Sequence, residues 1–297
     1  MKKLKNPNKG WTYETATGKI EYNLQNDMLF HYVMQQSKEA LKGLVCALKG
    51  ISPSEVMKIH VENPIELNNL GKATIMDIKL TLNNNEIMNI ELQMYSESEW
   101  IPRSVLYLCR AYDSIGRGDD YSLLKPTSMY CITDQDLISD AEPEFYAKYQ
   151  LLNVKTHKKY TDIIGVNVLQ LNQTEIATQE DIDNNLVYWA NLFKATTWED
   201  FKALAKDNPA IEEVGTMIFE LNYDNQAKEL LEGQRRYREQ MATEYAVGVR
   251  DTKKEMQPII DELEIKNAEI TAKYEKSESE KAKLKALLKE HGITVEE

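Results

Sequence analysis

The chain has 297 residues, of which 42% are hydrophobic and 28% charged, so it can bury a core and is too apolar to be disordered throughout. Its formal net charge of −12 excludes a basic surface over the whole protein, so nucleic-acid binding would need local basic residues or metal ions. The 3 cysteines are an odd number and lack a CxxC spacing, which argues against a disulfide framework or a cysteine-rich zinc site. No signal-peptide pattern and no apolar run of about 18 residues is present, so we expect a cytoplasmic protein without membrane contact.

The first fifty residues contain an arm and a helix. Residues 1–25 follow neither a helical nor a strand pattern and are predicted to form an irregular N-terminal arm. Residues 26–50 have helical spacing, with Asn26 or Asp27 as the N-cap and Gly50 directly after the last turn. This pattern predicts one helix ahead of the first strands.

The middle of the chain is rich in strand-like alternation. Two runs, 73–82 and 86–95, are separated by Asn83-Asn84-Asn85, a turn sequence that predicts an antiparallel hairpin. A helix is predicted over 99–117, where the pattern closes on Gly116 and Gly118. Further strands are predicted within 55–67, which Pro64 interrupts, at 128–133, and within 145–171.

From Asp183 onwards the pattern is helical, and after residue 250 it becomes a densely charged helix that Pro258 would kink or restart. Its sparse apolar residues recur in helical steps, but the intervening positions of the same stripe are polar. The apolar members are Ile259, Leu263, Ile270, Leu284 and Leu287, and the polar members are Lys266, Lys273, Ser277 and Glu280. Such a defective coiled-coil seam predicts either weak pairing with a second copy, as a homodimer, or a helix that projects and frays.

The candidate catalytic and metal-binding residues lie in the predicted hairpin, whose strands each have an apolar and a polar face. Asp77 and Lys79 lie on the polar face of the first strand, and Glu91 and Gln93 on that of the second. Two carboxylates beside an amide and an ammonium suit a hard divalent cation, which prefers oxygen ligands. A hairpin with one solvated face explains the same alternation, and the pattern alone favours that plainer interpretation.

The order Asp77 … Glu91-Leu92-Gln93 resembles the PD-(D/E)XK nuclease signature, in the variant with Gln in place of the usual Lys. Further blocks in the same order make the chain resemble, more narrowly, the recombination-promoting nuclease or putative transposase family of bacteria. The blocks are NDMLF, MDIKL, MNIELQM, WIPRSVLYLCRAY, RGDDYSLLKPTSMYCI, LVYWANLFKATTWEDFKALAKDNPAIEEV and EGQRRYREQ. They cover residues 26 to 250, although His31 replaces the family's usual basic residue and a longer charged helix replaces its Gly-rich tail.

The resemblance implies an α/β fold with a restriction-endonuclease-like core. That core is a mixed sheet of about four strands, entered from one helix and crossed by another. The implied organisation is an N-terminal arm over 1–25, a PD-(D/E)XK nuclease core over 26–172, a helical region over 173–250, and a charged C-terminal helix over 251–297.

The resemblance also implies a Mg²⁺-dependent DNA endonuclease, a hydrolase that acts in recombination or mobile elements. Asp77, Glu91 and the backbone carbonyl of Leu92 would hold one or two Mg²⁺ ions, while Gln93 would orient the attacking water. Asp27 would add a further carboxylate, but a role as N-cap alone is the favoured interpretation of that residue.

Cations near this motif have alternative interpretations. Lys79 would either supply the charge of the missing motif lysine or be a solvated strand residue. Arg103, Arg110 and Arg117 recur every seven residues, which suits a face that tracks phosphates but is usual for a solvated helix surface. Because Arg103 alone matches the family position, it is the arginine predicted to contact a DNA phosphate.

A second function class competes with the nuclease. The acidic composition and the Gln-for-Lys signature also suit a catalytically inactive nuclease-fold module that binds partners through its helical tail. Convergence of Asp77, Glu91 and Gln93 on one open cleft would keep catalysis possible, whereas a filled cleft or diverging carboxylates would favour the binding module.

Overall fold

The computed structural model describes residues 10–65, 77–95, 99–137 and 142–290. The chain divides into two compact units, the first extending to Gly233 and the second beginning at Gln234. Across the described ranges, no helix combines the length and the apolar character that crossing a membrane requires.

The first unit is built on a mixed sheet. Its strands are β1 (Ile59–Val61), β2 (Ile78–Leu82), β3 (Glu86–Gln93), β4 (Thr127–Thr133), β5 (Tyr146–Leu152) and β6 (Lys159–Gln170). They form a 6-stranded sheet in the order β1-β2-β3-β4-β6-β5. β4 runs parallel to both of its neighbours, β3 and β6. The other three pairings are antiparallel. The mixed sheet is therefore confirmed, and it is wider than the expected four strands.

The antiparallel hairpin of β2 and β3 is as predicted, and β3 ends at Gln93, two residues before the end of its sequence pattern. Asn83 and Asn84 adopt φ angles of 50° and 62°, the left-handed conformation that a tight hairpin turn requires. The Asn83 side chain accepts hydrogen bonds from the backbone N–H groups of Met57 and Lys58. The turn is therefore anchored to the segment that leads into β1. Residues 73–76 of the predicted first strand lie outside the described residues.

Helices make up most of the remaining structure. The α-helices are α1 (Asp27–Gln36), α2 (Lys38–Lys49), α3 (Trp100–Tyr112), α4 (Gln179–Asp183), α5 (Leu186–Lys194), α6 (Trp198–Ala205), α7 (Pro209–Tyr223) and α8 (Asn225–Glu290). Short 3-10 helices are η1 (Tyr13–Thr15), η2 (Pro53–Glu55), η4 (Tyr121–Leu123) and η5 (Leu171–Ile176). The helical prediction from Asp183 onwards is confirmed as far as Glu290, and α8 runs through Pro258 without restarting there.

The single helix predicted over residues 26–50 is wrong, because the structure has two helices that meet at Ser37. Ser37 has an extended backbone, and its hydroxyl donates to Glu213 of α7 at 2.9 Å, so a tertiary contact replaces helical continuity. Asn26 caps α1 by accepting from the Leu29 N–H at 3.0 Å. Asp27 is the first helical residue and not the cap.

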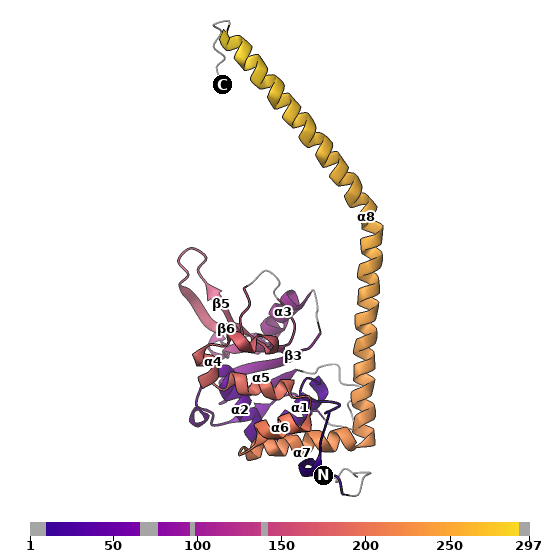
Figure 1. Cartoon of the computed structure of the whole chain (residues 1–297). Coiled ribbons are helices and arrows are strands. Elements are labelled where there is room, and N and C mark those ends of the chain that lie inside the picture. Colours follow the sequence, from indigo (N-terminus) through magenta and orange to yellow (C-terminus); the bar gives the residue numbers. More distant parts are fainter. Residues whose placement is uncertain (1–9, 66–76, 96–98, 138–141, 291–297) are drawn as a thin grey trace. The chain divides into compact units, whose positions relative to one another are not determined.

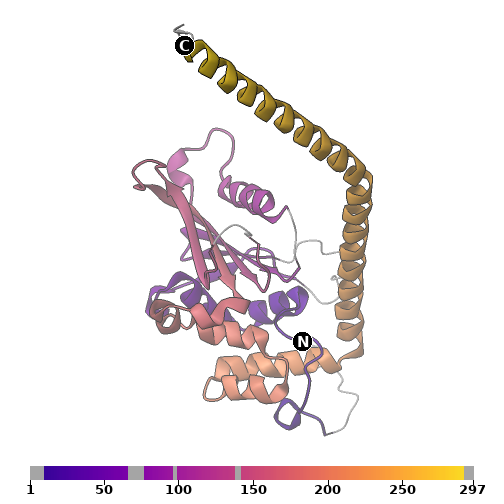
Figure 2. The ribbon, with the colours of Figure 1, turned by 45° about the horizontal axis from the view of Figure 1, so that its top comes forward.

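Helices lie on both sides of the sheet (Figures 1 and 2), and each face of the sheet buries an apolar cluster. Residues such as Leu80 and Ile90 are fully buried on one face, in the main core with α1, α2, α5, α6 and α7. On the other face, Trp100 of α3 packs in a smaller cluster with Cys131, Ala147 and Val168. Residues of β3 that lie between those pointing into the main core therefore point toward α3.

The N-terminal segment that the sequence leaves without a pattern packs on α7. Tyr22 is buried, and its backbone N–H and C=O both pair with the side chain of Asn222. Tyr13 is also buried, with its ring edge-on to that of Trp198. These contacts span most of the chain in sequence, which is why no local pattern announces them.

A glycine in α7 tests this packing. A Cβ at Gly215 would lie 2.5 Å from the Tyr13 ring and 2.8 Å from the Phe201 ring, so Gly215→Ala should lower the free energy of unfolding by about 1–3 kcal/mol. Gly233→Ala is the matched control, because that helical glycine has nothing within 4 Å and alanine favours helix by about 0.5–1 kcal/mol. Thermal unfolding of the two variants would measure the difference. Equal stability would contradict the close contact between the N-terminal segment and α7.

Candidate active site

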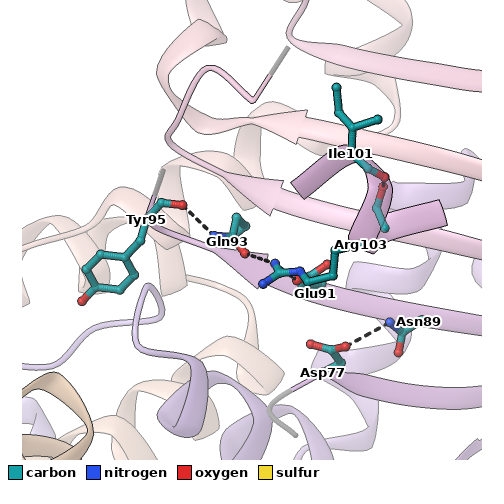
Figure 3. Close-up of polar contacts among 8 residues, drawn as sticks. Asp77, Asn89, Glu91, Gln93, Tyr95, Ile101 and Arg103 are labelled. Atoms are coloured by element: carbon teal, nitrogen blue, oxygen red, sulfur yellow. Dashed lines mark hydrogen bonds and ion pairs between the residues drawn. The ribbon is translucent and has the colours of Figure 1, made fainter. Parts of the chain in front are cut away.

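The two predicted carboxylates lie opposite each other on neighbouring strands. The register pairs Lys79 with Asn89, so continuing it by two residues places Asp77 opposite Glu91. Residues directly opposite in a sheet point to the same face. Glu91 also pairs with Cys131 of β4, which belongs to the face that α3 covers. The structure therefore brings both carboxylates to the α3 side of the sheet (Figure 3).

Asp77 directly precedes β2 and is partly buried. Burial raises the pKa of its carboxyl group, while the hydrogen bond from Asn89 and the charge of Arg103 act in the opposite direction. The Asn89 side-chain amide donates to Asp77 Oδ2 at 3.2 Å. The ionised carboxylate is therefore only partly compensated, which is the situation that a bound cation would relieve.

Arg103 of α3 connects the other two motif residues. Its Nη2 donates to Glu91 Oε1 at 2.7 Å and to Gln93 Oε1 at 2.6 Å (Figure 3). Gln93 Nε2 donates to the backbone carbonyl of Tyr95 at 2.6 Å, so both ends of the amide have defined partners. Glu91 and Gln93 are buried, with 5% and 6% of their surfaces exposed. A buried ion pair thus holds the motif side chains in one arrangement.

Lys79 lies on the same face but is engaged elsewhere. Its ammonium is 3.1 Å from Glu62 Oε2, and Glu62 also accepts a hydrogen bond from the Thr81 hydroxyl. Burial acts to raise the pKa of Glu62, but the hydrogen bonds from Thr81 and Lys79 outweigh it and lower that pKa. Both side chains of the Lys79–Glu62 pair are about one-third exposed, at 37% and 31%.

The remaining predicted residues are dispersed. Asp27 is buried at the start of α1, next to residues of the main core on the opposite face of the sheet. Arg110 is exposed on α3. Arg117 lies beyond the end of α3 at Tyr112, so the predicted stripe of three arginines on one helix is wrong. The helix stops before the glycines, where Asp113 already leaves the helical conformation.

Asn89 and Glu62 are the polar partners that sequence reasoning missed. Asn89 stands on the predicted polar face between the motif residues, so alternation could have identified it as a partner of Asp77. Glu62 comes from the segment after β1, and nothing in the local sequence indicates that it meets Lys79. The neighbouring Asn63 holds this segment in place by bonding the backbone of Asp77 and Lys79.

The carboxylates of Asp77 and Glu91 are oxygen donors of the kind that Mg²⁺ prefers. Within the ranges that the structure describes, no cluster of three or more His, Cys, Asp or Glu side chains is placed to hold a metal. Mg²⁺ is usually held by one or two carboxylates, with waters and substrate phosphates completing its shell. Asp77 and Glu91 supply that minimum from one face of the sheet, and the partial burial of Asp77 favours a cation beside it.

A mixed sheet with helices on both faces and an Asp … Glu-x-Gln motif on adjacent strands defines a restriction-endonuclease-like fold of the PD-(D/E)XK class. Comparison with known families agrees with this class: the family described as PD-(D/E)XK nuclease family transposase matches residues 24–248. The chain belongs to that family. No curated protein and no solved structure matches it. Membership supports a nuclease with a role in mobile elements.

The two ion pairs of this face should differ in their effect on stability. Arg103→Met would leave the buried Glu91 carboxylate without its cation and should lower the free energy of unfolding by about 2–4 kcal/mol. Lys79→Met, the control, breaks a more exposed pair and should cost about 1 kcal/mol or less. Glu91→Gln added to Arg103→Met should recover part of the loss. Urea unfolding would measure all three, and equal costs for Arg103→Met and Lys79→Met would refute the asymmetry.

Proposed function

We propose that the protein is a metal-dependent DNA endonuclease that hydrolyses phosphodiester bonds during recombination or the movement of mobile elements. The observation that supports this most directly is the β2–β3 register, which sets Asp77 opposite Glu91 with Gln93 next along the same face. The family match supports the class, and the register supports the proposed site. DNA is therefore the proposed substrate. The cytoplasm is the proposed location of the protein.

Asp77, Glu91 and the backbone carbonyl of Leu92 would hold Mg²⁺ or another divalent cation. Asp27 starts α1 on the other face of the sheet, so its proposed part is the start of that helix and not a ligand. When bound, such a cation lowers the pKa of a coordinated water and neutralises charge on the scissile phosphate. Asn89 holds Asp77 Oδ2 by a hydrogen bond and so limits the orientations of that carboxylate. The two strands thereby fix the acidic ligands before any substrate arrives.

Arg103 and Gln93 act on the substrate side of this arrangement. The planar guanidinium of Arg103 suits a phosphate oxygen, and its position beside Glu91 delivers that charge to the site. Gln93 positions the attacking water through its amide, which Arg103 and the Tyr95 carbonyl hold in a defined orientation. An amide cannot take the proton of that water, so Gln93 is a positioning residue and not the general base.

Two roles are proposed for Lys79, one in the active site and one in the structure, and a different observation supports each. As an active-site cation it would replace the lysine of the usual signature, since it shares a face with Asp77. Its ion pair with Glu62 supports the other role, in which it fixes the segment after β1 to β2. Cleavage by Lys79→Met at the wild-type rate would assign it to the structural role, and a large loss would assign it to the site.

The alternative function is a catalytically inactive module that binds partners through its helical tail. One observation favours it: Arg103 already neutralises Glu91 and accounts for the Gln93 carbonyl, so these two motif residues are satisfied by the protein itself. In that case the ion pair would be a structural substitute for the cation. A cleavage assay separates the two functions.

Plasmid cleavage by the full-length protein tests the proposed activity. Wild type should cut with Mg²⁺ or Mn²⁺ and lose activity with chelator, whereas Asp77→Ala and Glu91→Gln should each be slower by about 10²-fold or more, because each removes a negative ligand. Asp162→Ala is a control, since that carboxylate is exposed and paired with Lys159. Wild-type cleavage by both Asp77→Ala and Glu91→Gln would place the chemistry elsewhere. No cleavage by wild type under these conditions would favour the binding module.

Substitutions at Gln93 test its proposed role in positioning water. Gln93→Ala should bind metal like wild type but slow the chemical step by about 10²–10³-fold, the usual cost of losing one positioned donor. Gln93→Lys restores the common signature and should remain active, because an ammonium there can donate to Glu91. Single-turnover cleavage at saturating metal would measure both. A Gln93→Ala variant with an unchanged rate constant would exclude Gln93 from the chemistry.

A further inference from the structure

The C-terminal half of α8 exposes apolar side chains that no other described residue of its own unit covers. Every residue from 243 to 286 is exposed, including large side chains such as Leu263, Ile270 and Tyr274 at 54%, 62% and 67%. An isolated helix of such polar composition gains little stability in water, because helices in proteins depend on burying an apolar stripe. The regular spacing of these side chains indicates which kind of partner would cover them.

A stripe that begins at Met256 alternates steps of four and three residues without interruption. Its members are Met256, Ile260, Leu263, Asn267, Ile270, Tyr274, Ser277, Lys281, Leu284 and Leu288. This frame differs from the defective seam that starts at Ile259, because it uses Ile260 and Tyr274. Lys266, Lys273 and Glu280 then leave the seam and flank it. In heptad notation, Ile260, Asn267 and Tyr274 are a positions, and Leu263 and Ile270 are d positions.

We propose that α8 pairs with α8 of a second copy as a parallel, in-register, two-stranded coiled coil over residues 256–288. Charge complementarity sets the orientation. In a parallel pair, each g position meets the e position of the next heptad on the other helix. Lys273 then meets Glu278 of the second copy, and Glu280 meets Lys285 of the second copy. Symmetry repeats both attractive pairs on the other side of the seam.

Polar residues within the seam fix the register. Asn267 occupies an a position, where a pair of asparagines favours two strands in register at some cost in stability. Lys281 lies 3.1 Å from Glu278 on its own helix, so its aliphatic stem can cover the seam while its charge stays in solvent. Pro258 falls at an f position, which points away from the partner. The polar positions weaken the coil, so we expect dimers that dissociate on dilution.

Parallel pairing has a consequence that rests on the proposed nuclease activity. In a parallel pair the two chains enter the coil together, each after its own first unit in sequence, so one dimer carries two candidate active sites. A particle of that kind can cut both strands of one duplex. The pairing itself is independent of any activity and can be tested without it.

Two serines of α8 provide a matched pair for disulfide trapping in the full-length chain. Ser277 is a d position in the seam, and Ser279 is an f position on the outside. Cys109 is exposed, whereas Cys46 and Cys131 are buried, so both variants are made on a Cys109→Ser background. In a glutathione redox buffer, Ser277→Cys should form a covalent dimer at least tenfold more readily than Ser279→Cys. Equal trapping of both variants, or trapping of neither, would overturn the parallel register.

A second measurement tests the pairing without a disulfide. Leu263→Glu removes a d-position contact and should shift the full-length protein to monomers in sedimentation velocity. Ile265→Glu alters an equally exposed apolar residue at an f position and should leave the dimer intact. A wild-type monomer at all concentrations, or dimers that survive Leu263→Glu, would overturn the coiled coil. Because neither experiment depends on cleavage, such a result would leave the proposed nuclease untouched.

Discussion

The antiparallel register of β2 and β3 is the constraint on which the candidate site depends. The left-handed Asn83-Asn84 turn and the apolar face that includes Leu80 and Ile90 specify this register together. A slip by one residue would turn the buried side chains outward and move Asp77 and Glu91 to opposite faces. Burial of the apolar face of the hairpin therefore also aligns the two carboxylates. No further element is needed to bring Asp77 and Glu91 to the same face.

Charge balance at this face determines what the site can do. Glu91 is neutralised by Arg103, whereas Asp77 has a hydrogen bond from Asn89 and a raised pKa because it is partly buried. A cation beside Asp77 would favour its ionised form and compete with Arg103 for Glu91. Release of the guanidinium toward a phosphate would then accompany loading of the metal. The residues that hold this face of the sheet together are thus the ones that the proposed ligands would engage.

The sequence predicts those features that local pattern or chemistry dictates. The hairpin, its polar face and the family blocks follow from alternation and residue type. The break at Ser37 does not, because it depends on a hydrogen bond to Glu213 far along the chain. The same holds for the pairing of Lys79 with Glu62 and the packing of Tyr13 against α7, which arise from tertiary contacts. The end of α3 at Tyr112, ahead of the glycines, likewise separated Arg117 from the helix on which it was expected.

Binding of Mn²⁺ to the full-length protein, followed by electron paramagnetic resonance, tests the central claim that Asp77 and Glu91 form one cation site. Wild type should bind the ion, and more tightly as the pH rises, because Asp77 must lose its proton to act as a ligand. Asp77→Asn and Glu91→Gln should each weaken binding by about tenfold or more. Equal affinity in all three proteins would contradict the account, because the strand register would then serve the fold alone.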